Sequence, residues 1–338
     1  MKKMKHPPWR VWRLLIPVLC LALLPAGCGS AGERTTLSVS AMDTFMSVEL
    51  YGSKETASKV KEQIESLDLH LSPTVKSSDM TRLNHRKKIK AHEESAEAVT
   101  QALKYCKETN GALDITVYPL VKEWGFLSGS YKVPDKSKIS ELLKKVDYRK
   151  VNVSGSEITL SDGAQIDMGA VAKGFAADKA NEILKSENVT SAILNLGGTV
   201  SAYGAKPDGS DWKVGIANPI DGGEPIGTVS CKDKIIATSG NYERYFEKDG
   251  KRYCHMIDPK TGYPVDNDMS SVSVVSDSGV ESDCLSTALY VMGQKKALEY
   301  QKAHPEIDLV ILTKNKEVIV TDGIKEKFQL NDKTYSII

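Results

Sequence analysis

Three features that identify common classes of protein are missing from this sequence. Its 45 lysines and arginines are balanced by 44 aspartates and glutamates, so the formal net charge of +1 gives no basic excess with which to bind nucleic acid. Its six cysteines contain no Cys-x-x-Cys pair, which argues against zinc ribbons, iron–sulfur clusters and thioredoxin-like redox chemistry. No segment recurs with a period of about 20–50 residues, so solenoids and propellers are excluded.

The apolar run near the start of the chain is too short to span a membrane. Residues 14–24 number only eleven and include Pro17, whereas a spanning helix needs about 20 residues. Residues 1–28 carry five basic residues and no acid, which leaves the rest of the chain with a formal charge of −4. A basic start, a short apolar run and small residues are typical of a secretory signal.

The end of this signal contains Ala26-Gly27-Cys28, which resembles the lipobox of bacterial lipoproteins, in which the cysteine is lipidated. Pro25 occupies a position that usually holds an aliphatic residue. We expect residues 1–28 to be a lipoprotein signal peptide, Cys28 to be lipidated, and a lipid anchor to hold the protein at the extracytoplasmic face of the cell membrane. Plain secretion, with Cys28 incidental, is the alternative.

The rest of the chain is predicted to be a tether followed by one domain. Residues 29–36 are small and polar, and we expect them to form a flexible tether without folded structure. Residues 37–338 show no shift in composition that would mark a boundary. Helical and hairpin patterns are mixed without regular βαβ spacing, so the predicted fold class is α+β. The patterns predict helices over residues 60–71, 93–109, 171–184, 281–292 and 295–304, and strands over 37–50, 151–160 (a hairpin), 191–196, 212–217, 227–236, 271–276, 308–313 and 317–321.

The predicted domain contains four cysteines, at positions 106, 231, 254 and 284. One or two disulfides are possible among Cys106, Cys231, Cys254 and Cys284 in an exported protein, and the sequence does not assign them. Cys254 precedes His255, but adjacent residues of a strand point to opposite faces. A catalytic pair of these two side chains is therefore not expected.

Five polar or glycine-containing segments are candidates for a functional site. The first, residues 41–46, is a polar interruption within a predicted strand, and its structural alternative is a β-bulge. The second follows the helix stop at Asn110-Gly111, where Asp114 stands between apolar residues. This acid either contacts a ligand or caps a turn.

The third candidate, residues 166–175, is predicted to be a strand end, a tight turn and the start of a helix. A run of free backbone N–H groups, with Lys173 on the first helical turn, suits a phosphate or pyrophosphate. The segment matches neither the Rossmann nor the Walker pattern. Asp167, taken alone, is better explained as a helix cap.

The fourth candidate joins the hydroxyl-rich segment Thr238-Ser239-Gly240 to His255, which lies just before an Asp-Pro-x-Thr-Gly turn. A histidine beside such a segment can act as a general base, although a single histidine is more often structural. The fifth is residues 281–289, where Asp283 and Thr287 share one face of a predicted helix. A carboxylate, a hydroxyl, a backbone carbonyl and phosphate oxygens are typical ligands of Mg²⁺, and complementing the helix dipole is the alternative role of Asp283.

Taken together and in order, these segments resemble the ApbE family of extracytoplasmic lipoproteins, which are FAD:protein FMN transferases. The resemblance runs from about Leu37 to Thr321 and implies an ApbE-like α+β fold of mixed helices and antiparallel-rich sheets that encloses an FAD cleft. Its most specific motifs are Ile166-Asp-Met-Gly-Ala-Val-Ala-Lys-Gly174, Asn195-Leu-Gly-Gly198, Thr238-Ser-Gly240, His255-x-x-Asp-Pro259 and Asp283-x-x-Ser-Thr287.

The reaction implied by this resemblance depends on Mg²⁺ and uses FAD as a bound substrate. A threonine or serine hydroxyl of a target protein attacks the phosphorus on the FMN side of FAD, FMN becomes phosphoester-linked, and AMP leaves. The implied acceptors are electron-transfer proteins with an FMN-binding domain. The resemblance implies that His255 accepts the proton of the attacking hydroxyl, and that the Ala170 carbonyl, Asp283 and Thr287 hold the metal. The FAD contacts that it implies are Met42, Ala112, Leu113, Asp114, Asp167, Lys173, Gly197, Gly198, Thr238, Ser239 and Ile257.

Three positions depart from the family pattern. Asp43 stands where the family usually has glycine, Thr74 where an aromatic residue is common, and Thr199 where aspartate is usual. None of them removes the implied base or metal ligands. Two alternatives stay open: an FAD pyrophosphatase, in which water replaces the protein hydroxyl, and a non-enzymatic flavin-binding lipoprotein, which would not need a base and metal ligands together.

Overall fold

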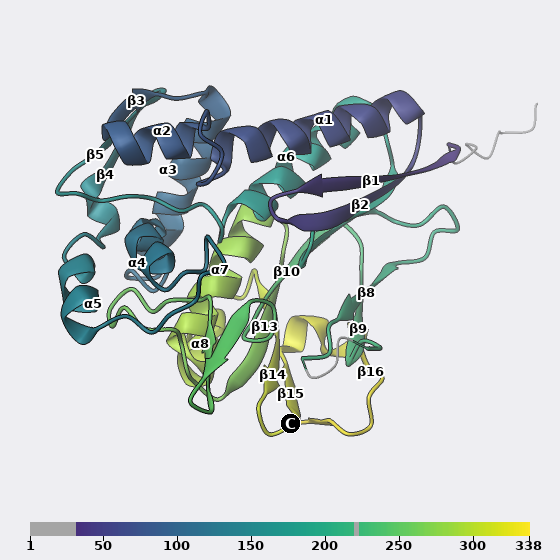
Figure 1. Ribbon diagram of the computed structural model, residues 1–338. Helices are drawn as coiled ribbons and strands as arrows, with labels where there is room; N and C mark the ends of the chain where they lie inside the picture. The colour runs from purple at the N-terminus through teal and green to yellow at the C-terminus, as the bar shows by residue number, and fades with distance from the viewer. Residues whose placement is uncertain (1–31, 220–222) are drawn as a thin grey trace, which may run out of the picture. The chain divides into compact units, whose positions relative to one another are not determined.

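The computed structural model (Figure 1) describes residues 32–219 and 223–338. The described residues belong to one unit, which runs from Ala31 to Ile338. The predicted signal peptide, with Cys28, lies outside the described residues. No helix within the described ranges is long and apolar enough to cross a membrane.

A nine-stranded sheet forms the centre of the unit. In spatial order its strands are β1 (Arg34–Ala41), β2 (Thr44–Tyr51), β6 (Ser191–Asn195), β7 (Thr199–Gly204), β10 (Lys234–Gly240), β13 (Met269–Ser276), β14 (Asp308–Thr313), β15 (Glu317–Val320) and β17 (Ser336–Ile337). Neighbouring strands are antiparallel, except for β15 and β17. Every residue of β13 is buried, because both faces of the sheet are covered at this strand.

Helices cover one face of the sheet (Figure 1). They are α1 (Lys54–Leu71), α6 (Ala172–Ser186) and α7 (Gly279–Met292), and α8 (Gln294–Ala303) follows directly after α7. The spacing of Val60, Ile64 and Leu67 places them on one buried face of α1, as the helical period requires. The other face of the sheet is covered by a three-stranded sheet of β8 (Trp212–Ile216), β9 (Gly227–Cys231) and β16 (Phe328–Leu330), which forms a second apolar cluster with β14.

The remaining elements complete the unit. They are α2 (Asp79–Arg86), β3 (Lys88–Lys90), α3 (Glu93–Glu108), η1 (Ile115–Val117), α4 (Tyr118–Glu123), α5 (Lys136–Leu143), η2 (Tyr148–Lys150), β4 (Val151–Ser154), β5 (Glu157–Leu160), β11 (Tyr245–Lys248), β12 (Lys251–Cys254) and η3 (Asp322–Lys327). The hairpin of β11 and β12 packs with α4 and α5 around Trp124 in a third apolar cluster.

Two glycines allow α6 and α7 to touch backbone to backbone. A Cβ placed on Gly174 would lie 2.1 Å from the carbonyl oxygen of Gly279, and one placed on Gly279 would lie 2.2 Å from the carbonyl oxygen of Gly174. Asp178 of α6 fixes the same contact, because its carboxylate accepts hydrogen bonds from the amides of Gly279 and Val280 at 2.6 and 3.0 Å. The start of α6 is thereby placed directly against the first turns of α7.

The α+β prediction is confirmed, and each predicted helix is present with ends that differ by a few residues. The predicted tether is wrong at its end, because Arg34–Thr36 begin β1. The predicted strand over residues 37–50 is a hairpin of two strands. Ile166 does not belong to a strand; instead, its amide and carbonyl bond to the side chain of Asn84. No disulfide forms among the described cysteines, since Cys106, Cys231, Cys254 and Cys284 are all free and buried.

Candidate active site

The turn between β1 and β2 forms one wall of the candidate site. Met42 and Asp43 are its two residues, with positive φ angles of 51° and 56°. The polar interruption predicted here is therefore a hairpin turn, and the β-bulge alternative is wrong. The β6–β7 turn approaches it closely: a Cβ placed on Gly197 would come within 2.4 Å of the Thr44 side chain. Gly197 and Gly198 both have positive φ, which suits residues without a Cβ.

Arg244 connects this hairpin turn to the segment that carries His255. Its Nη1 lies 3.6 Å from Oδ2 of Asp43, and its Nη2 donates a hydrogen bond to the Asp43 carbonyl oxygen at 3.4 Å. The carbonyl of Arg244 accepts a hydrogen bond from the His255 amide at 2.9 Å. The Nδ1 atom of His255 lies 3.3 Å from the same oxygen, so the residue before β11 fixes the ring that follows β12.

The surroundings of His255 keep its imidazole neutral. Its pKa is lowered to about 4, mainly by burial; the positive charges of Arg244 and Lys173 act in the same direction, and the contact with the Arg244 backbone opposes them. At neutral pH the ring therefore has a free lone pair. Cys254 points elsewhere, because its thiol contacts the carbonyl oxygens of Met256 and Val265, and burial raises its pKa. The expectation that Cys254 and His255 form no catalytic pair is confirmed.

Lys173 lies on the first turn of α6, at the contact with α7. Its Nζ is 3.4 Å from the Gly169 carbonyl oxygen and 3.8 Å from Oδ1 of Asp283. Burial raises the pKa of Asp167 and of Glu243, and the charge of Lys173 opposes that rise, so the ammonium group lies within electrostatic reach of both carboxylates. Lys173 is thus the cation shared by the acidic groups of the site.

The backbone amides before α6 are less free than the sequence predicted. The amides of Val171 and Ala172 donate to the Met168 carbonyl, and that of Gly169 donates to Oδ1 of Asp167 at 2.7 Å. The prediction of a run of unbonded N–H groups is therefore wrong for these residues, because the turn uses them itself. Burial raises the pKa of Asp167, whereas the Gly169 amide and the charges of Arg244 and Lys173 oppose that rise.

The predicted metal ligands lie where α6 meets α7. The Gly174 amide is one of the first amides of α6, which have no acceptor within the helix, and it donates to Oδ2 of Asp283 at 2.9 Å. The Ala170 carbonyl lies two residues before the start of α6, and Oδ1 of Asp283 lies 3.8 Å from Nζ of Lys173. Thr287 lies one turn further along α7. A carboxylate, a hydroxyl and a backbone carbonyl are hard oxygen ligands, so the chemistry of this donor set fits Mg²⁺.

Acids, histidines and cysteines form no group of three or more that could hold a metal within the described part of the chain. The donor set predicted at the α6–α7 contact contains a single carboxylate, so it is not a group of that kind. Bound phosphate oxygens are the typical way in which such a set is completed for Mg²⁺.

The end of β10 lies against α7 and the β6–β7 turn. Ser239 is buried, and its Oγ lies 2.9 Å from Oγ of Ser286 and 3.3 Å from Oγ1 of Thr287. Thr238 donates its amide to the Gly198 carbonyl at 2.9 Å and shares a hydrogen bond with the Ser273 hydroxyl at 2.7 Å. The Ser239 hydroxyl therefore aligns β10 with the predicted metal ligand Thr287, and the Thr238 amide aligns it with the glycine turn.

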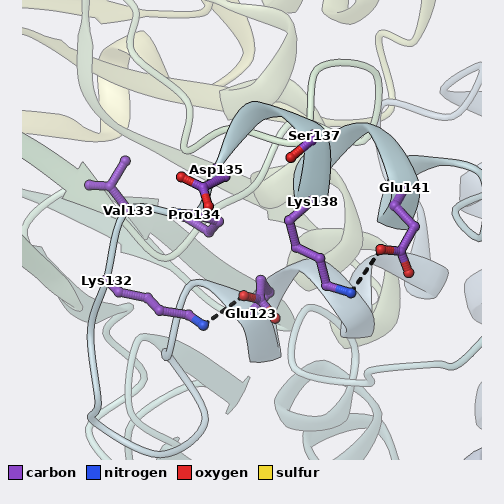
Figure 2. Close-up of a pocket in the computed structure, with 8 residues that line it drawn as sticks. All are labelled: Glu123, Lys132, Val133, Pro134, Asp135, Ser137, Lys138 and Glu141. Atoms are coloured by element: carbon purple, nitrogen blue, oxygen red, sulfur yellow. Dashed lines mark hydrogen bonds and ion pairs between the residues drawn. The ribbon is translucent and has the colours of Figure 1, made fainter.

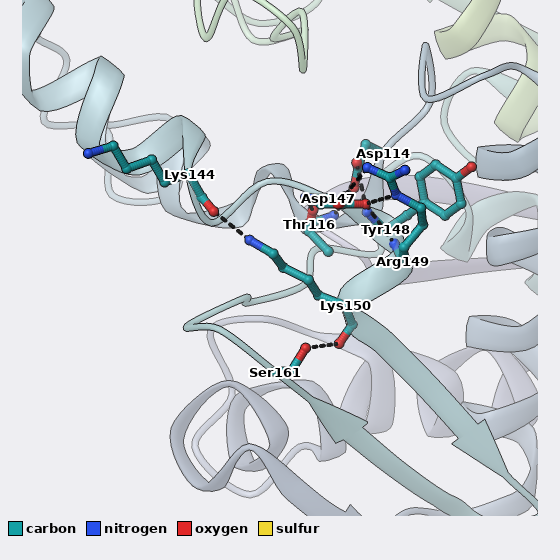
Figure 3. A network of polar contacts seen from close by, with 8 residues as sticks. All are labelled: Asp114, Thr116, Lys144, Asp147, Tyr148, Arg149, Lys150 and Ser161. Atoms are coloured by element: carbon teal, nitrogen blue, oxygen red, sulfur yellow. Dashed lines mark hydrogen bonds and ion pairs between the residues drawn. The ribbon is translucent and has the colours of Figure 1, made fainter.

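Asp114 is part of a structural network at the edge of the site (Figure 3). Its Oδ1 accepts from the amide and hydroxyl of Thr116 at 2.8 and 2.6 Å, and its Oδ2 accepts from the Tyr148 amide at 2.9 Å. Its side chain therefore caps η1, the structural alternative that the sequence analysis left open. The segment still reaches the site, because the Asp167 amide donates to the Ile115 carbonyl at 2.8 Å.

The side chains of the other predicted ligand residues belong to the apolar core rather than to the site. Ala112 and Leu113 are buried between α3 and η1, and the side chain of Ile257 is buried in the cluster around Trp124. Only their backbones are therefore suited to touch a ligand. Thr74 is exposed in the loop after α1, whereas Thr199 is fully buried in β7.

Glu243 and Arg244 follow the hydroxyl-rich segment at residues 238–240 and were not predicted as site residues. The crowding of protein around Glu243 and the negative charge of Asp283 raise its pKa, and Lys173 and Arg244 oppose them. A charged pair directly after a hydroxyl-rich strand end was the available signal in the sequence. It could be interpreted only once the fold showed which way the two side chains point.

Two cavities of the described structure are not lined by the predicted ligands. One, of about 440 Å³, lies between α4, α5 and the loop at residues 132–135, where Glu123 pairs with Lys132 and Lys138 with Glu141 (Figure 2). The other, of about 650 Å³, is lined by Tyr245 and Arg252 of the β11–β12 hairpin. Arg244 and His255 lie on the opposite face of that hairpin, because side chains alternate along a strand.

The structure thus gathers residues from separate parts of the chain into one cluster. Its members are the β1–β2 turn, Asp167, Ala170 and Lys173, the β6–β7 turn, Thr238 and Ser239, Arg244, His255, Asp283 and Thr287. Two cations, Lys173 and Arg244, lie within electrostatic reach of the same imidazole. Such an arrangement can bind a di-anionic phosphate group, hold a metal against it and remove a proton from a weak nucleophile.

Comparison with known proteins gives consistent relatives. The model of the ApbE family matches residues 42–311. The chain is 32% identical over 323 residues to the FAD:protein FMN transferase of Haemophilus influenzae, covering 89% of this chain and 93% of that protein. It is 31% identical to the FAD:protein FMN transferase of Treponema pallidum, covering 96% of each. The crystal structure of the ApbE protein from Thermotoga maritima superposes with a TM-score of 0.81 at 28% identity, covering 87% of this chain and 99% of that one.

Proposed function

This chain belongs to the ApbE family and is a transferase, and we propose that it moves FMN from FAD to a threonine or serine hydroxyl of a protein outside the cytoplasm, releasing AMP. The observation that carries the proposal is the neutral imidazole of His255 within reach of two cations, Lys173 and Arg244. A diphosphate needs the cations, and a hydroxyl nucleophile needs the base.

In the proposed reaction His255 acts as the general base. Its Nδ1 faces the Arg244 carbonyl, which favours a proton on Nδ1 and leaves the lone pair on Nε2 to accept the hydroxyl proton. The hydroxyl oxygen forms a bond to the phosphorus on the FMN side of FAD. The bond from that phosphorus to the bridging oxygen breaks, and the AMP phosphate carries away the electron pair.

The cations and hydroxyls of the site position the diphosphate for this attack. Lys173 and Arg244 offset the negative charge on the phosphate oxygens, and the glycine turn at residues 197–198 leaves room for close approach. Asp283, Thr287 and the Ala170 carbonyl would hold Mg²⁺. Bound there, Mg²⁺ supplies charge stabilisation to phosphate oxygens as a Lewis acid.

Mass spectrometry of the acceptor tests this proposal directly. The purified protein is incubated with FAD, Mg²⁺ and a candidate electron-transfer protein that has an FMN-binding domain. The expected result is an acceptor heavier by one FMN on a threonine or serine, with AMP formed in equal amount. Free FMN and AMP with an unmodified acceptor would identify a pyrophosphatase, and unchanged FAD would contradict both reactions.

The place of action is proposed from the N-terminal sequence. Cleavage just before Cys28 would remove the signal and leave this cysteine, lipidated, as the new N-terminus, which would hold the enzyme at the extracytoplasmic face of the membrane. Metabolic labelling with a fatty acid tests this. Label in the full-length chain that disappears in Cys28→Ser supports the anchor, and label that persists in this variant contradicts it.

A further inference from the structure

Asp43 presents a carboxylate to the cation on which the proposed diphosphate site depends. The residue forms the second position of the β1–β2 turn, and its Oδ2 lies 3.6 Å from Nη1 of Arg244. Both side chains are open to solvent, with exposed fractions of 78% for Asp43 and 46% for Arg244. The carboxylate therefore lies where a phosphate oxygen could also reach the same guanidinium.

The ion pair between Asp43 and Arg244 is weak. Exposed ion pairs contribute little to stability, because water and salt screen them and ordering the side chains costs entropy. A phosphate group forms stronger, charge-assisted hydrogen bonds with a guanidinium. Entry of a phosphate would thus displace the Asp43 carboxylate from Arg244, while the contact between Arg244 and the Asp43 carbonyl oxygen does not depend on the carboxylate.

Asp43 differs in this respect from the other acids of the site. Asp167 receives a hydrogen bond from the Gly169 amide, and Asp283 receives one from the Gly174 amide, so both carboxylates are tied to the backbone. Asp43 extends from a turn toward Arg244. Its negative charge also raises the pKa of Asp167, which shows that its field reaches the interior of the site.

Resting on the proposed function, we infer that Asp43 is a specificity-determining residue, whose carboxylate competes with phosphate groups for Arg244. Every ligand that brings a phosphate to Arg244 must replace Asp43 and tolerate its charge. Asp43 therefore weakens the binding of FAD and of the product AMP, and it favours release of AMP after transfer. Riboflavin, which carries no phosphate, is not subject to this competition.

Equilibrium binding to the complete protein tests the inference without turnover. FAD and riboflavin are titrated by flavin fluorescence and AMP by calorimetry, in EDTA, with wild type, Asp43→Asn and Asp43→Gly. Asparagine and glycine both tolerate a positive φ, so the turn conformation is kept, and thermal unfolding of each variant checks this. The matched control is Glu247→Gln, which removes the carboxylate of an exposed ion pair with Arg252 in the β11–β12 hairpin.

The expected result is that Asp43→Asn binds FAD and AMP about two- to fivefold more tightly, the range of an exposed ion pair, and binds riboflavin as wild type does. Glu247→Gln should bind all three ligands as wild type does. Unchanged or weaker binding of FAD and AMP by Asp43→Asn would overturn the inference, as would an equal change for riboflavin. A wild type that binds FAD but never modifies an acceptor would contradict the proposed function alone, and one that binds neither FAD nor AMP would contradict both.

Discussion

Two buried aspartates of this protein, Asp114 and Asp283, have similar exposure but opposite surroundings. Both oxygens of Asp114 accept hydrogen bonds from Thr116 and Tyr148, groups that belong to the turns it caps (Figure 3). Asp283 has one oxygen bound by the Gly174 amide, and its other oxygen faces the Lys173 ammonium at 3.8 Å. A carboxylate with both oxygens hydrogen-bonded to nearby groups of the fold has a structural role, whereas one with an oxygen that accepts no hydrogen bond and faces a cation can serve a ligand.

The same contrast extends to the neighbours of each acid. Around Asp114, the polar groups of Asp147 and Arg149 bond to each other and to the local backbone. Around Asp283, Lys173, Arg244 and His255 influence one another through space at longer range. Saturated short-range bonds therefore mark the structural region, and charges left incompletely paired mark the site of chemistry.

The largest expected effect tests the chemical side of this contrast. Asp283→Ala should lower the rate of transfer by about 10³-fold, because charge stabilisation by a bound metal is worth several kcal/mol. The rate should also cease to depend on Mg²⁺ concentration. Transfer is measured by phosphoester-linked FMN on the acceptor over a Mg²⁺ series. A variant that keeps the wild-type rate and Mg²⁺ response would place the metal elsewhere.

His255→Ala sharpens the distinction between binding and chemistry within the site. Loss of a general base should lower the transfer rate by about 10²-fold or more, while FAD binding stays close to that of wild type. Single-turnover assays with saturating FAD, together with fluorescence titration, separate the two quantities. Full transfer by the variant would remove the assignment of the base.

Asp114→Ala should have the reverse profile. It leaves the amides of Thr116 and Tyr148 and the Thr116 hydroxyl without their acceptor, which should lower the free energy of unfolding by about 2–4 kcal/mol. The transfer rate per folded molecule should change by less than about threefold, because the carboxylate is fully used in the network. Chemical denaturation and active-site titration give the two numbers. A stable variant without activity would show that Asp114 belongs to the chemical group.

The smallest expected effect concerns the pKa of His255. In the free enzyme its pKa is about 4, so the imidazole should stay neutral, and competent as a base, well below the usual titration range of histidine. Burial is the main cause and the positive charge of Arg244 a further one, so Arg244→Gln should raise this pKa part of the way toward 6.5. NMR titration of the ring in wild type, Arg244→Gln and the control Arg252→Gln measures the shift. An unchanged pKa in Arg244→Gln would show that Arg244 does not act on the ring.

Local patterns predicted much of the fold. The periodicity of Val60, Ile64 and Leu67 identified α1, and the turn at Gly155 placed the hairpin of β4 and β5. The Met42–Asp43 turn was not found, because methionine rarely adopts a positive φ and the usual hairpin signals, Asn-Gly and Asp-Gly, are absent. The strands β7, β11 and β12 were also missed, since they are short or lie between polar turns.

Sequence patterns could name chemical groups at the site but not the partners that decide their roles. Asp114 lies in a motif that predicted a ligand contact. Its second oxygen, however, accepts a hydrogen bond from the amide of Tyr148, which is 34 residues away in the sequence. Arg244 was passed over because its significance arises from contacts with Asp43, which is 201 residues away. The spacing of residues along the chain does not show which distant residues come into contact. The motifs of a known family indicate such contacts only for residues whose roles in that family are known.

The contact between Gly174 and Gly279 has a consequence for the interpretation of sequence variants. The two backbones meet so closely that even the methyl group of alanine would force α6 and α7 apart. Lys173 and Asp283 lie on either side of this contact, so any such separation moves a cation away from its carboxylate. Two residues that have no functional group of their own are therefore as restricted as the reacting ones, and a natural variant at either glycine would resemble an active-site mutant while altering no chemical group.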